Sequence, residues 1–383
     1  MRLRANGLVL SIAFVAAMML AWAAFSMLSK QPGSIPPTGP YAVGDCSLDL
    51  MLTQAIASNS ASGSSAAAVG AMVQLWYPVQ ATGRDGSALP PSQLPLIFYF
   101  SSWAGTALEN TNLVRELVSR GFAVVSVIYP GRSPGQSQGD WERERTQLEE
   151  PMDFSSESAF NKTVSLATER VEQRSADASK ILDGLASAKR TAHANCPVSV
   201  LDLDRVGIMG YSIGGAVASE TAVRDPRFRA AVNLDGWQFS KAAADGVNRP
   251  FLLMSDASPP PTEADLAAPD PVMRYTSQLS KTDLAASMSH LRQYGGLFVT
   301  VAHAGHESFS SAAILSWRHR LRGGTWRHRR VQEVVNAYVG AFFERVFKNQ
   351  DSPLLHTNSA SFPDADLQVW QGSAWPPVSV NKF

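Results

Sequence analysis

The stretch VGIMGYSIGGAVASE (206–220) places one serine between glycines where a strand pattern meets a helix pattern. Residues 206–209 are apolar and favour a β-strand, and small residues from Ala216 onward favour a helix. Two interpretations are open here. Glycines make tight turns and serine favours helix N-termini, so the stretch can be an ordinary turn. Alternatively, Ser212 is a nucleophile that a sharp strand-to-helix turn lifts clear of a sheet.

Short apolar runs alternate with helical patterns along most of the chain. We expect strands at 71–79, 95–101, 122–130, 205–211, 230–236, 250–256 and 296–303. We expect helices at 109–121, 168–190, 214–225 and 329–348. Several of the strand runs are continuously apolar, as strands buried on both faces are. The alternation predicts an α/β fold with a mostly parallel central sheet flanked by helices.

The domain boundaries follow changes in composition. A Pro/Gly linker at 31–40 separates the N-terminal segment 1–30 from a single catalytic domain, which we expect at 41–350. Within it, residues 131–160 are polar and long for a strand-to-helix connection. They are therefore either a lid over the site or a passive surface loop. Residues 351–383 are a weakly patterned C-terminal tail.

The N-terminal segment has two arginines followed by the uncharged stretch 5–29. This stretch is long enough to span a bilayer. Ala21-Trp22-Ala23 also fits the cleavage site of a signal peptide. A retained anchor and a cleaved signal peptide both stay open, and both predict export to the periplasm or the exterior. In an exported chain, Cys46 and Cys196 either pair once or remain two small buried thiols.

The charge balance argues against a nucleic-acid partner, because 33 basic residues face 33 acidic ones. One local exception is WRHRLRGGTWRHRR (317–330), with six arginines and two tryptophans. It is either a solvated loop and helix start or a patch that meets anionic lipid headgroups. We therefore expect any membrane association to involve residues 5–29 and 317–330.

A nucleophilic serine needs a histidine base and a carboxylate that orients the histidine. Of the seven histidines, His303 and His306 lie just past the last expected strand, and His306 is in the loop proper. Asp235 and Asp256 each end a strand after the serine, and spacing does not choose between them. The histidine spacing lacks a strong third ligand, so we expect neither a metal nor a cofactor.

The motifs around these residues resemble those of the platelet-activating factor acetylhydrolase family and its bacterial relatives. The matching motifs are Gly210-Tyr211-Ser212-Ile213-Gly214-Gly215, Asp225-Pro226-Arg227-Phe228, Asn233-Leu234-Asp235-Gly236-Trp237 and His306-Glu307-Ser308-Phe309. The resemblance extends from about residue 41 to residue 355. It implies an α/β-hydrolase fold and a catalytic triad of Ser212, Asp235 and His306. A weaker similarity to polyester and dienelactone hydrolases would favour Asp256 as the acid.

The chain departs from that family after the strand at 95–101. Relatives carry His-Gly-x-Gly there, whereas this chain has Ser101-Ser102-Trp103-Ala104-Gly105. An oxyanion hole needs backbone N–H groups and not particular side chains. We expect the amides of Ile213 and Trp103 to supply it, or Ala104 if the register shifts by one. Trp103 and Trp237 are the expected substrate-binding side chains, with plain packing as the alternative for Trp103.

These observations predict a serine hydrolase of carboxylic esters, of short-chain or phospholipid type. Its expected partner is a small-molecule or lipid ester. The alternatives are a polyester or dienelactone-type hydrolase or a peptidase on the same fold, and a non-catalytic envelope protein.

Overall fold

The structure is a computed structural model that describes residues 34–51, 70–79, 93–103, 105–128, 151–190, 196–311, 314 and 325–376. The expected signal or anchor segment at 1–30 lies outside these residues. So do 131–150 of the expected lid insert, 317–324 of the basic stretch, and Ala104. Within the described ranges, no helix has the length and apolar character needed to cross a membrane.

A nine-stranded sheet forms the centre of the described part of the chain, with strand order β1-β2-β4-β3-β5-β6-β7-β8-β9. The strands are β1 (Ala42–Met51), β2 (Gly70–Val79), β3 (Leu94–Phe100), β4 (Ala123–Ile128), β5 (Leu201–Tyr211), β6 (Phe228–Leu234), β7 (Phe251–Asp256), β8 (Gly296–Val301) and β9 (Ala365–Trp370). The run from β4 to β8 is parallel. At the two edges, β2 pairs antiparallel with both β1 and β4, and β9 pairs antiparallel with β8.

All seven strands expected from the sequence are present, as β2 to β8. The two edge strands were not predicted. In particular, β9 lies in the C-terminal tail beyond residue 350, where it pairs with β8 from Gly296↔Trp370 to Val301↔Ala365. The sheet therefore extends past the expected domain boundary.

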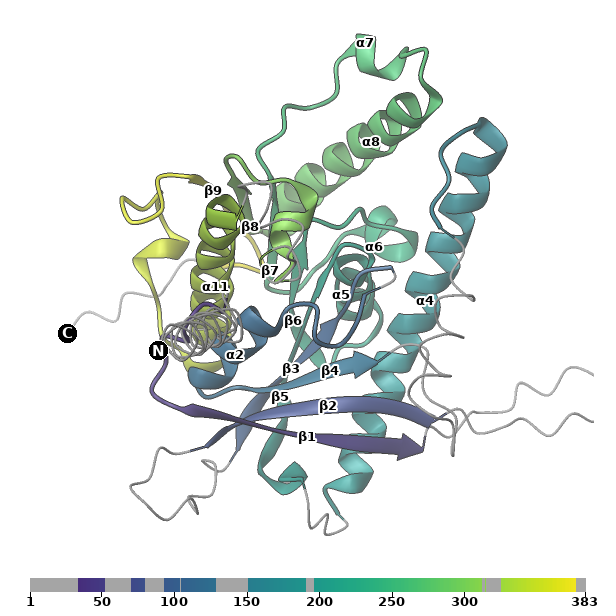
Figure 1. Ribbon diagram of the computed structural model, residues 1–383. Coiled ribbons are helices and arrows are strands. Elements are labelled where there is room, and N and C mark those ends of the chain that lie inside the picture. The colour runs from purple at the N-terminus through teal and green to yellow at the C-terminus, as the bar shows by residue number, and fades with distance from the viewer. Residues whose placement is uncertain are drawn as a thin grey trace, which may run out of the picture.

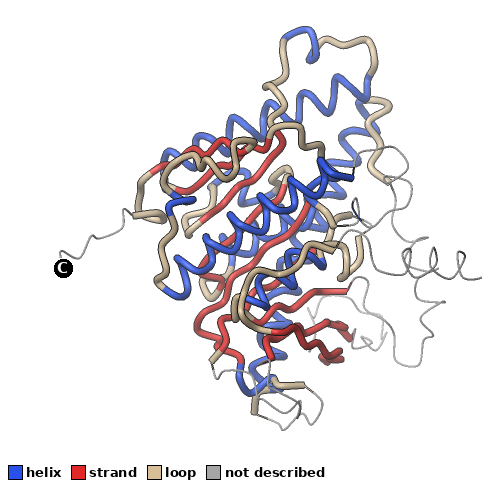
Figure 2. Tube along the Cα trace, turned by 60° about the vertical axis from the view of Figure 1, so that its left-hand side comes forward, coloured by secondary structure: helices blue, strands red, loops and turns tan. Residues whose placement is uncertain are grey.

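Helices cover both faces of the sheet (Figure 1). The α-helices are α2 (Thr111–Ser119), α4 (Glu157–Ala188), α5 (Ile213–Arg224), α6 (Ser240–Asp245), α7 (Glu263–Leu266), α8 (Pro271–Tyr294) and α11 (Thr325–Lys348). Three short 3₁₀ turns are η1 (Val198–Val200), η2 (His306–Phe309) and η3 (Pro353–Leu355). Buried residues of α4 and α5 share one apolar core with the strands, and those of α2 and α11 share the other. Figure 2 shows the strands in red between these two sets of blue helices.

The long helices α4 and α8 begin where polar side chains cap their first turns. Ser156 accepts a hydrogen bond from the amide of Ala159, and Asp270 accepts one from Val272 ahead of Pro271. Such caps satisfy amides that have no partner inside the helix. Figure 1 shows the N-terminal ends of α4 and α8 projecting beyond the sheet, with α7 at the tip. Together these two helix ends lie beyond one end of the parallel strands, and we call them the cap.

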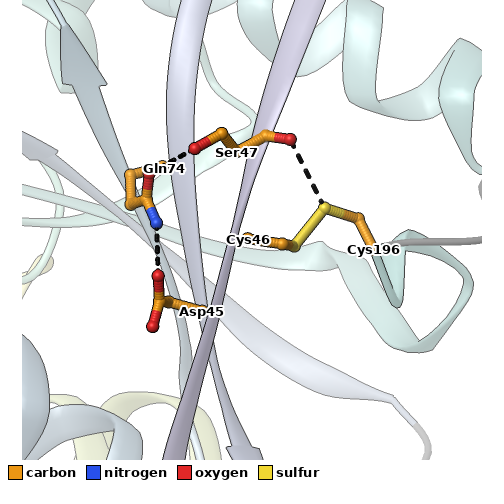
Figure 3. Close-up of a disulfide and its surroundings, with 5 residues drawn as sticks. All are labelled: Asp45, Cys46, Ser47, Gln74 and Cys196. Atoms are coloured by element: carbon orange, nitrogen blue, oxygen red, sulfur yellow. Dashed lines mark hydrogen bonds between the residues drawn. A yellow bond between two sulfur atoms is a disulfide. The ribbon is translucent and has the colours of Figure 1, made fainter.

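A disulfide joins Cys46 in β1 to Cys196, which lies just before η1 (Figure 3). The two Cα atoms are 5.8 Å apart, and 150 positions separate the cysteines in sequence. Of the two alternatives left open by the sequence, the structure has the paired one. The bond ties an edge strand to the segment that leads into β5.

We expect the disulfide to stabilise the protein by roughly 2–5 kcal/mol, because it removes conformations from the unfolded chain. Reduction should lower the denaturation midpoint of the wild type but leave that of the double variant Cys46→Ser/Cys196→Ser unchanged. Thermal and urea melts with and without reductant check this. Two free thiols in the denatured, unreduced wild type would contradict it.

Candidate active site

Ser212 lies at the turn between β5 and α5 with a backbone φ of +58° and ψ of −126°. Non-glycine residues rarely adopt a positive φ, so the surrounding structure must impose this conformation. Its amide donates to the carbonyl of Leu234 at 2.9 Å, which fixes the turn against β6. A strained serine at a strand-to-helix junction is the geometry of a nucleophile elbow.

The glycines of the motif allow the backbone to approach itself closely. A Cβ on Gly210 would lie 2.1 Å from the carbonyl oxygen of Gly214. A Cβ on Gly214 would lie 2.1 Å from the carbonyl oxygen of Phe100, at the end of β3. The first turn of α5 therefore packs directly on the loop after β3, and no larger residue fits at these positions.

Asp235 follows β6, and its carboxylate points toward the loop after β8 that carries His306, which we call the histidine loop. Oδ2 lies 2.7 Å from Nδ1 of His306. Oδ1 accepts from the hydroxyl of Ser255 at 2.9 Å and from the amide of Asp256 at 3.3 Å. The carboxylate of Asp256 instead accepts from the amide of Ser258 at 3.0 Å. The structure thus places Asp235, and not Asp256, against His306.

His306 is the first residue of η2, in the loop after β8. Its Nε2 lies 3.1 Å from Oγ of Ser212, so the imidazole bridges the serine and Asp235. The side chain is about half exposed, at 50%. Its ring packs on that of Tyr211, with centroids 4.9 Å apart. The other candidate, His303, is an exposed residue in the turn after β8.

The carboxylates around His306 raise its pKa above the ordinary histidine value. Burial alone would lower this pKa, because it disfavours the charged imidazolium. The hydrogen bond and charge of Asp235 raise the pKa, and the charges of Asp256 and Glu109 raise it further. The net shift is upward. The site is therefore built to stabilise a positive charge on His306.

The expected oxyanion donors belong to two different segments of the chain. Ile213 is the first residue of α5, and Trp103 follows β3. The carbonyl of Ser102 accepts from the amide of Gly105 at 3.2 Å and from Arg174 at 3.5 Å. In a trans peptide the N–H points opposite to the C=O. The amide of Trp103 therefore points away from both Gly105 and Arg174.

An aromatic cluster joins the cap to the site. Trp237, two residues after Asp235, donates its indole N–H to Ser280 of α8 at 3.2 Å. Its ring meets Phe154 edge-on, with centroids 6.2 Å apart. Phe154 in turn packs against Phe160 of α4, which stacks on Tyr275 of α8 at 4.9 Å. The described part of the expected lid insert, 151–160, thus contacts the predicted substrate-binding tryptophan.

The other predicted tryptophan, Trp103, lies beneath α4. The guanidinium of Arg170 lies 3.9 Å from the centre of its ring, and Arg174 donates to its carbonyl at 3.4 Å. A cation over an indole face is a favourable contact. Trp103 is partly buried in the core shared with α4, so packing and substrate contact are compatible roles for it.

The described part of the basic stretch, residues 325–330, forms the start of α11. Two of its arginines make intramolecular ion pairs, Arg329 with Glu333 at 3.2 Å and Arg330 with Asp364 at 2.8 Å. Trp326 is 65% exposed. The contact with anionic lipid stays a prediction, and neither the described residues nor the comparisons support membrane association.

Several side chains at the site were not predicted from the sequence. Glu109 accepts both donors of Ser102, and Asn110 binds the histidine loop through the carbonyl of Phe309. Asp283 of α8 accepts from the amide of Gln238 at 2.6 Å, and burial raises its pKa to about 7. Asn110 and Asp283 lie far in sequence from what they contact, and Glu109 contacts a residue seven positions earlier across an irregular loop. No local pattern distinguishes them from surface residues.

Among the described residues, no group of His, Cys, Asp or Glu is arranged to hold a metal ion.

Comparison with known proteins gives the same architecture. Residues 118–270 match the model of a family described as PETase, PET hydrolase-like. The match includes Ser212 and Asp235 and ends before His306. A solved structure of ferulic acid esterase from Streptomyces cinnamoneus aligns with a TM-score of 0.61 and 22% identity, covering 88% of this chain and 99% of that one. The chain has the α/β-hydrolase fold.

The fold predicted from the sequence is confirmed by these comparisons. The two descriptions, a PET hydrolase-like family and an esterase, support a carboxylic ester hydrolase in general. They do not single out the platelet-activating factor acetylhydrolase family, so that narrower assignment stays a prediction.

We expect His306 to titrate above the ordinary histidine pKa, because Asp235 stabilises its protonated form. Asp235→Asn should lower this pKa by removing the charge while keeping the shape of the side chain. Histidine NMR titrations of both proteins check this, with the signal assigned through His306→Gln. An unchanged pKa in Asp235→Asn would contradict the contact.

Proposed function

We propose that this protein is a serine hydrolase of carboxylic esters that works through Ser212, His306 and Asp235. One observation carries the proposal. The three side chains, from three different loops, form one chain of contacts, 3.1 Å from Ser212 to His306 and 2.7 Å from His306 to Asp235. A serine on an elbow with an oriented base is the arrangement that nucleophilic acyl transfer requires.

The first half of the reaction forms an acyl-enzyme. Oγ of Ser212 attacks the ester carbonyl while Nε2 of His306 accepts its proton. Asp235 holds Nδ1–H and stabilises the imidazolium that results. His306 then gives the proton to the departing alcohol as the ester C–O bond breaks. In the second half, His306 deprotonates a water molecule, whose oxygen attacks the acyl carbon. The bond between the acyl carbon and Oγ of Ser212 then breaks, His306 returns the proton to Oγ, and the acid leaves.

The oxyanion formed in each half needs N–H donors close to Ser212. The amide of Ile213 belongs to the first turn of α5, where backbone amides and the helix dipole favour negative charge. The amide of Trp103 is the second proposed donor. Its loop is supported by the close contact between Gly214 and the end of β3. Both donors are backbone groups, so the absence of the His-Gly-x-Gly motif is compatible with catalysis.

The proposed substrates are esters of short-chain or phospholipid type. The resemblance to platelet-activating factor acetylhydrolases supports this class. The aromatic cluster of Trp237, Phe154, Phe160 and Tyr275 supplies an apolar wall close to Asp235. We place the non-reacting part of the substrate against this wall.

Polyester cleavage is a second candidate function. The match of residues 118–270 to the PET hydrolase-like family favours it. Release of soluble acids from a polyester film, compared with hydrolysis of soluble esters, separates the two. If soluble esters turn over and the film releases nothing above the Ser212→Ala background, the polyester candidate fails.

We further propose that the protein is exported. The disulfide between Cys46 and Cys196 supports this, since structural disulfides form and persist in oxidising compartments. The N-terminal segment that would direct export lies outside the described residues.

Ser212→Ala should lower hydrolysis of p-nitrophenyl acetate by roughly 10⁴-fold or more, because the acyl-enzyme can no longer form. Ser258→Ala, at an exposed position after β7, is the matched control and should keep wild-type turnover. Initial rates with acetate, butyrate and octanoate esters check this. Wild-type turnover in Ser212→Ala would contradict the assignment of Ser212 as the nucleophile.

Trp237→Ala should remove bulk from the apolar wall and leave more room for a long acyl chain. The octanoate-to-acetate ratio of kcat/KM should then rise by about tenfold, the lower end of what one methylene is worth in a hydrophobic pocket. Trp326→Ala removes an exposed tryptophan elsewhere and should leave the ratio unchanged. An equal ratio in the wild type and Trp237→Ala would remove Trp237 from the substrate site.

A further inference from the structure

Glu109 carries a carboxylate close to the triad. This carboxylate takes no part in the proton transfers of the proposed reaction. Glu109 lies in the turn before α2, and its side chain is partly buried. Oε2 accepts from the amide of Ser102 at 2.8 Å, and Oε1 accepts from the hydroxyl of the same residue at 2.6 Å. The hydroxyl of Tyr99 donates to Oε2 at 3.3 Å. One carboxylate thus holds both donors of the residue that precedes Trp103.

The contact fills the space beside Gly105. A Cβ on Gly105 would lie 2.5 Å from Oε2 of Glu109 and 2.7 Å from the hydroxyl of Ser102. Gly105 therefore lets the backbone come close to the carboxylate of Glu109 and the hydroxyl of Ser102. In the absence of the family's glycine-rich motif, the side chain of Glu109 can define the shape of the loop.

The turn that contains Glu109 is hydrogen-bonded to the histidine loop. The side chain of Asn110 donates to the carbonyl of Phe309 at 2.9 Å and accepts from the amide of Ser311 at 3.1 Å. The hydroxyl of Ser310 donates to the carbonyl of Glu109 itself at 3.2 Å. Residues 109–110 thus join the loop of Ser102 to the loop of His306.

Charge couples Glu109 to His306 as well. Burial raises the pKa of Glu109, while hydrogen bonds from Ser102 and Tyr99 and the charge of His306 oppose the rise. In return, the charge of Glu109 helps to raise the pKa of His306. Each charged form stabilises the other, and His306 is charged in the step that forms the oxyanion.

We infer that Glu109 is a positioning residue of the ester-hydrolysing centre. Its carboxylate fixes Ser102 through both of its donors, so that the amide of the next residue, Trp103, faces the oxyanion. Its negative charge supports the imidazolium of His306. This inference rests on the proposed function, and it assigns a role to a residue that no sequence motif marks.

The test replaces the carboxylate by its neutral isostere, Glu109→Gln. We expect kcat for p-nitrophenyl butyrate to fall roughly tenfold to a hundredfold with KM little changed, because the misplaced donor acts in the transition state. We also expect the pKa of His306 to fall, since one of its neighbouring negative charges is gone. The acidic limb of the kcat/KM profile should therefore move to lower pH.

The other groups that face His306 define what must stay constant. They are the carboxylates of Asp235 and Asp256 and the ring of Tyr211, whose own pKa is raised by burial and then by the charges of Glu109, Asp235 and Glu307. None of these residues is substituted in Glu109→Gln, and only the pKa of Tyr211 loses a contribution, that of the charge of Glu109. The matched control Glu333→Gln removes the same charge from α11, where Glu333 pairs with Arg329. It should change neither the rate nor the pKa of His306.

Ser102→Ala separates the two parts of the role. It removes the hydroxyl contact but keeps the amide contact and the charge, so it should lower kcat without moving the pKa of His306. Thermal melts of each variant report whether the fold is kept. If Glu109→Gln does not fold, Ser102→Ala still decides the positioning role, and wild-type kcat in that variant overturns it.

Two readouts keep this inference separate from the proposed function. Ester hydrolysis by the wild type tests the function. The NMR titration of His306 in the wild type and Glu109→Gln needs no turnover and tests the coupling directly. An inactive wild type with a lowered His306 pKa in Glu109→Gln would defeat the function and keep the coupling. An active wild type whose kcat and His306 pKa are matched by Glu109→Gln would overturn the inference.

Discussion

The site depends on one backbone contact, between the first turn of α5 and the end of β3. Where Gly214 would carry a side chain, the carbonyl oxygen of Phe100 already lies 2.1 Å away. This contact places the N-terminus of α5 beside the loop that begins at Ser101, directly after the positive-φ turn at Ser212. Because the chain cannot relax there without separating the helix from the sheet, the serine, the helix amides and the loop after β3 keep one arrangement.

Much of this arrangement could be predicted from local sequence. Residues 206–220 mark the elbow through the switch from β-forming to small helix-forming residues, and the seven inner strands are apolar enough to be recognised singly. The order of the motifs along the chain and the positions of the strand ends leave two candidate histidines for the base and two candidate aspartates for the acid. Local pattern could not choose Asp235 over Asp256, because both end parallel strands. The choice depends on which carboxylate reaches Nδ1 of His306, which is a property of the folded sheet.

The features that escaped prediction depend on long-range contacts. β1 and β9 are edge strands with mixed composition, and each is a strand because of the neighbour it pairs with. The helix α8 is rich in serine and threonine and becomes part of the site through Ser280 and Asp283. The sequence predicts that Glu109 lies at the exposed start of a helix. In the structure it accepts from Ser102, seven residues earlier, and lies near His306, almost 200 residues later. Polar residues in such positions carry no periodic signal.

The disulfide has a topological consequence for the exported protein that we propose. The bond between Cys46 and Cys196 closes a covalent ring that contains β2, β3, β4, α2 and α4. A protease that cuts one peptide bond inside this ring opens it without releasing a fragment, since both pieces remain attached through sulfur. The strand that carries the oxyanion loop therefore cannot be lost through a single cleavage within the ring, whereas one cut between Ser212 and His306 leaves the serine and the histidine loop on separate pieces with no covalent link.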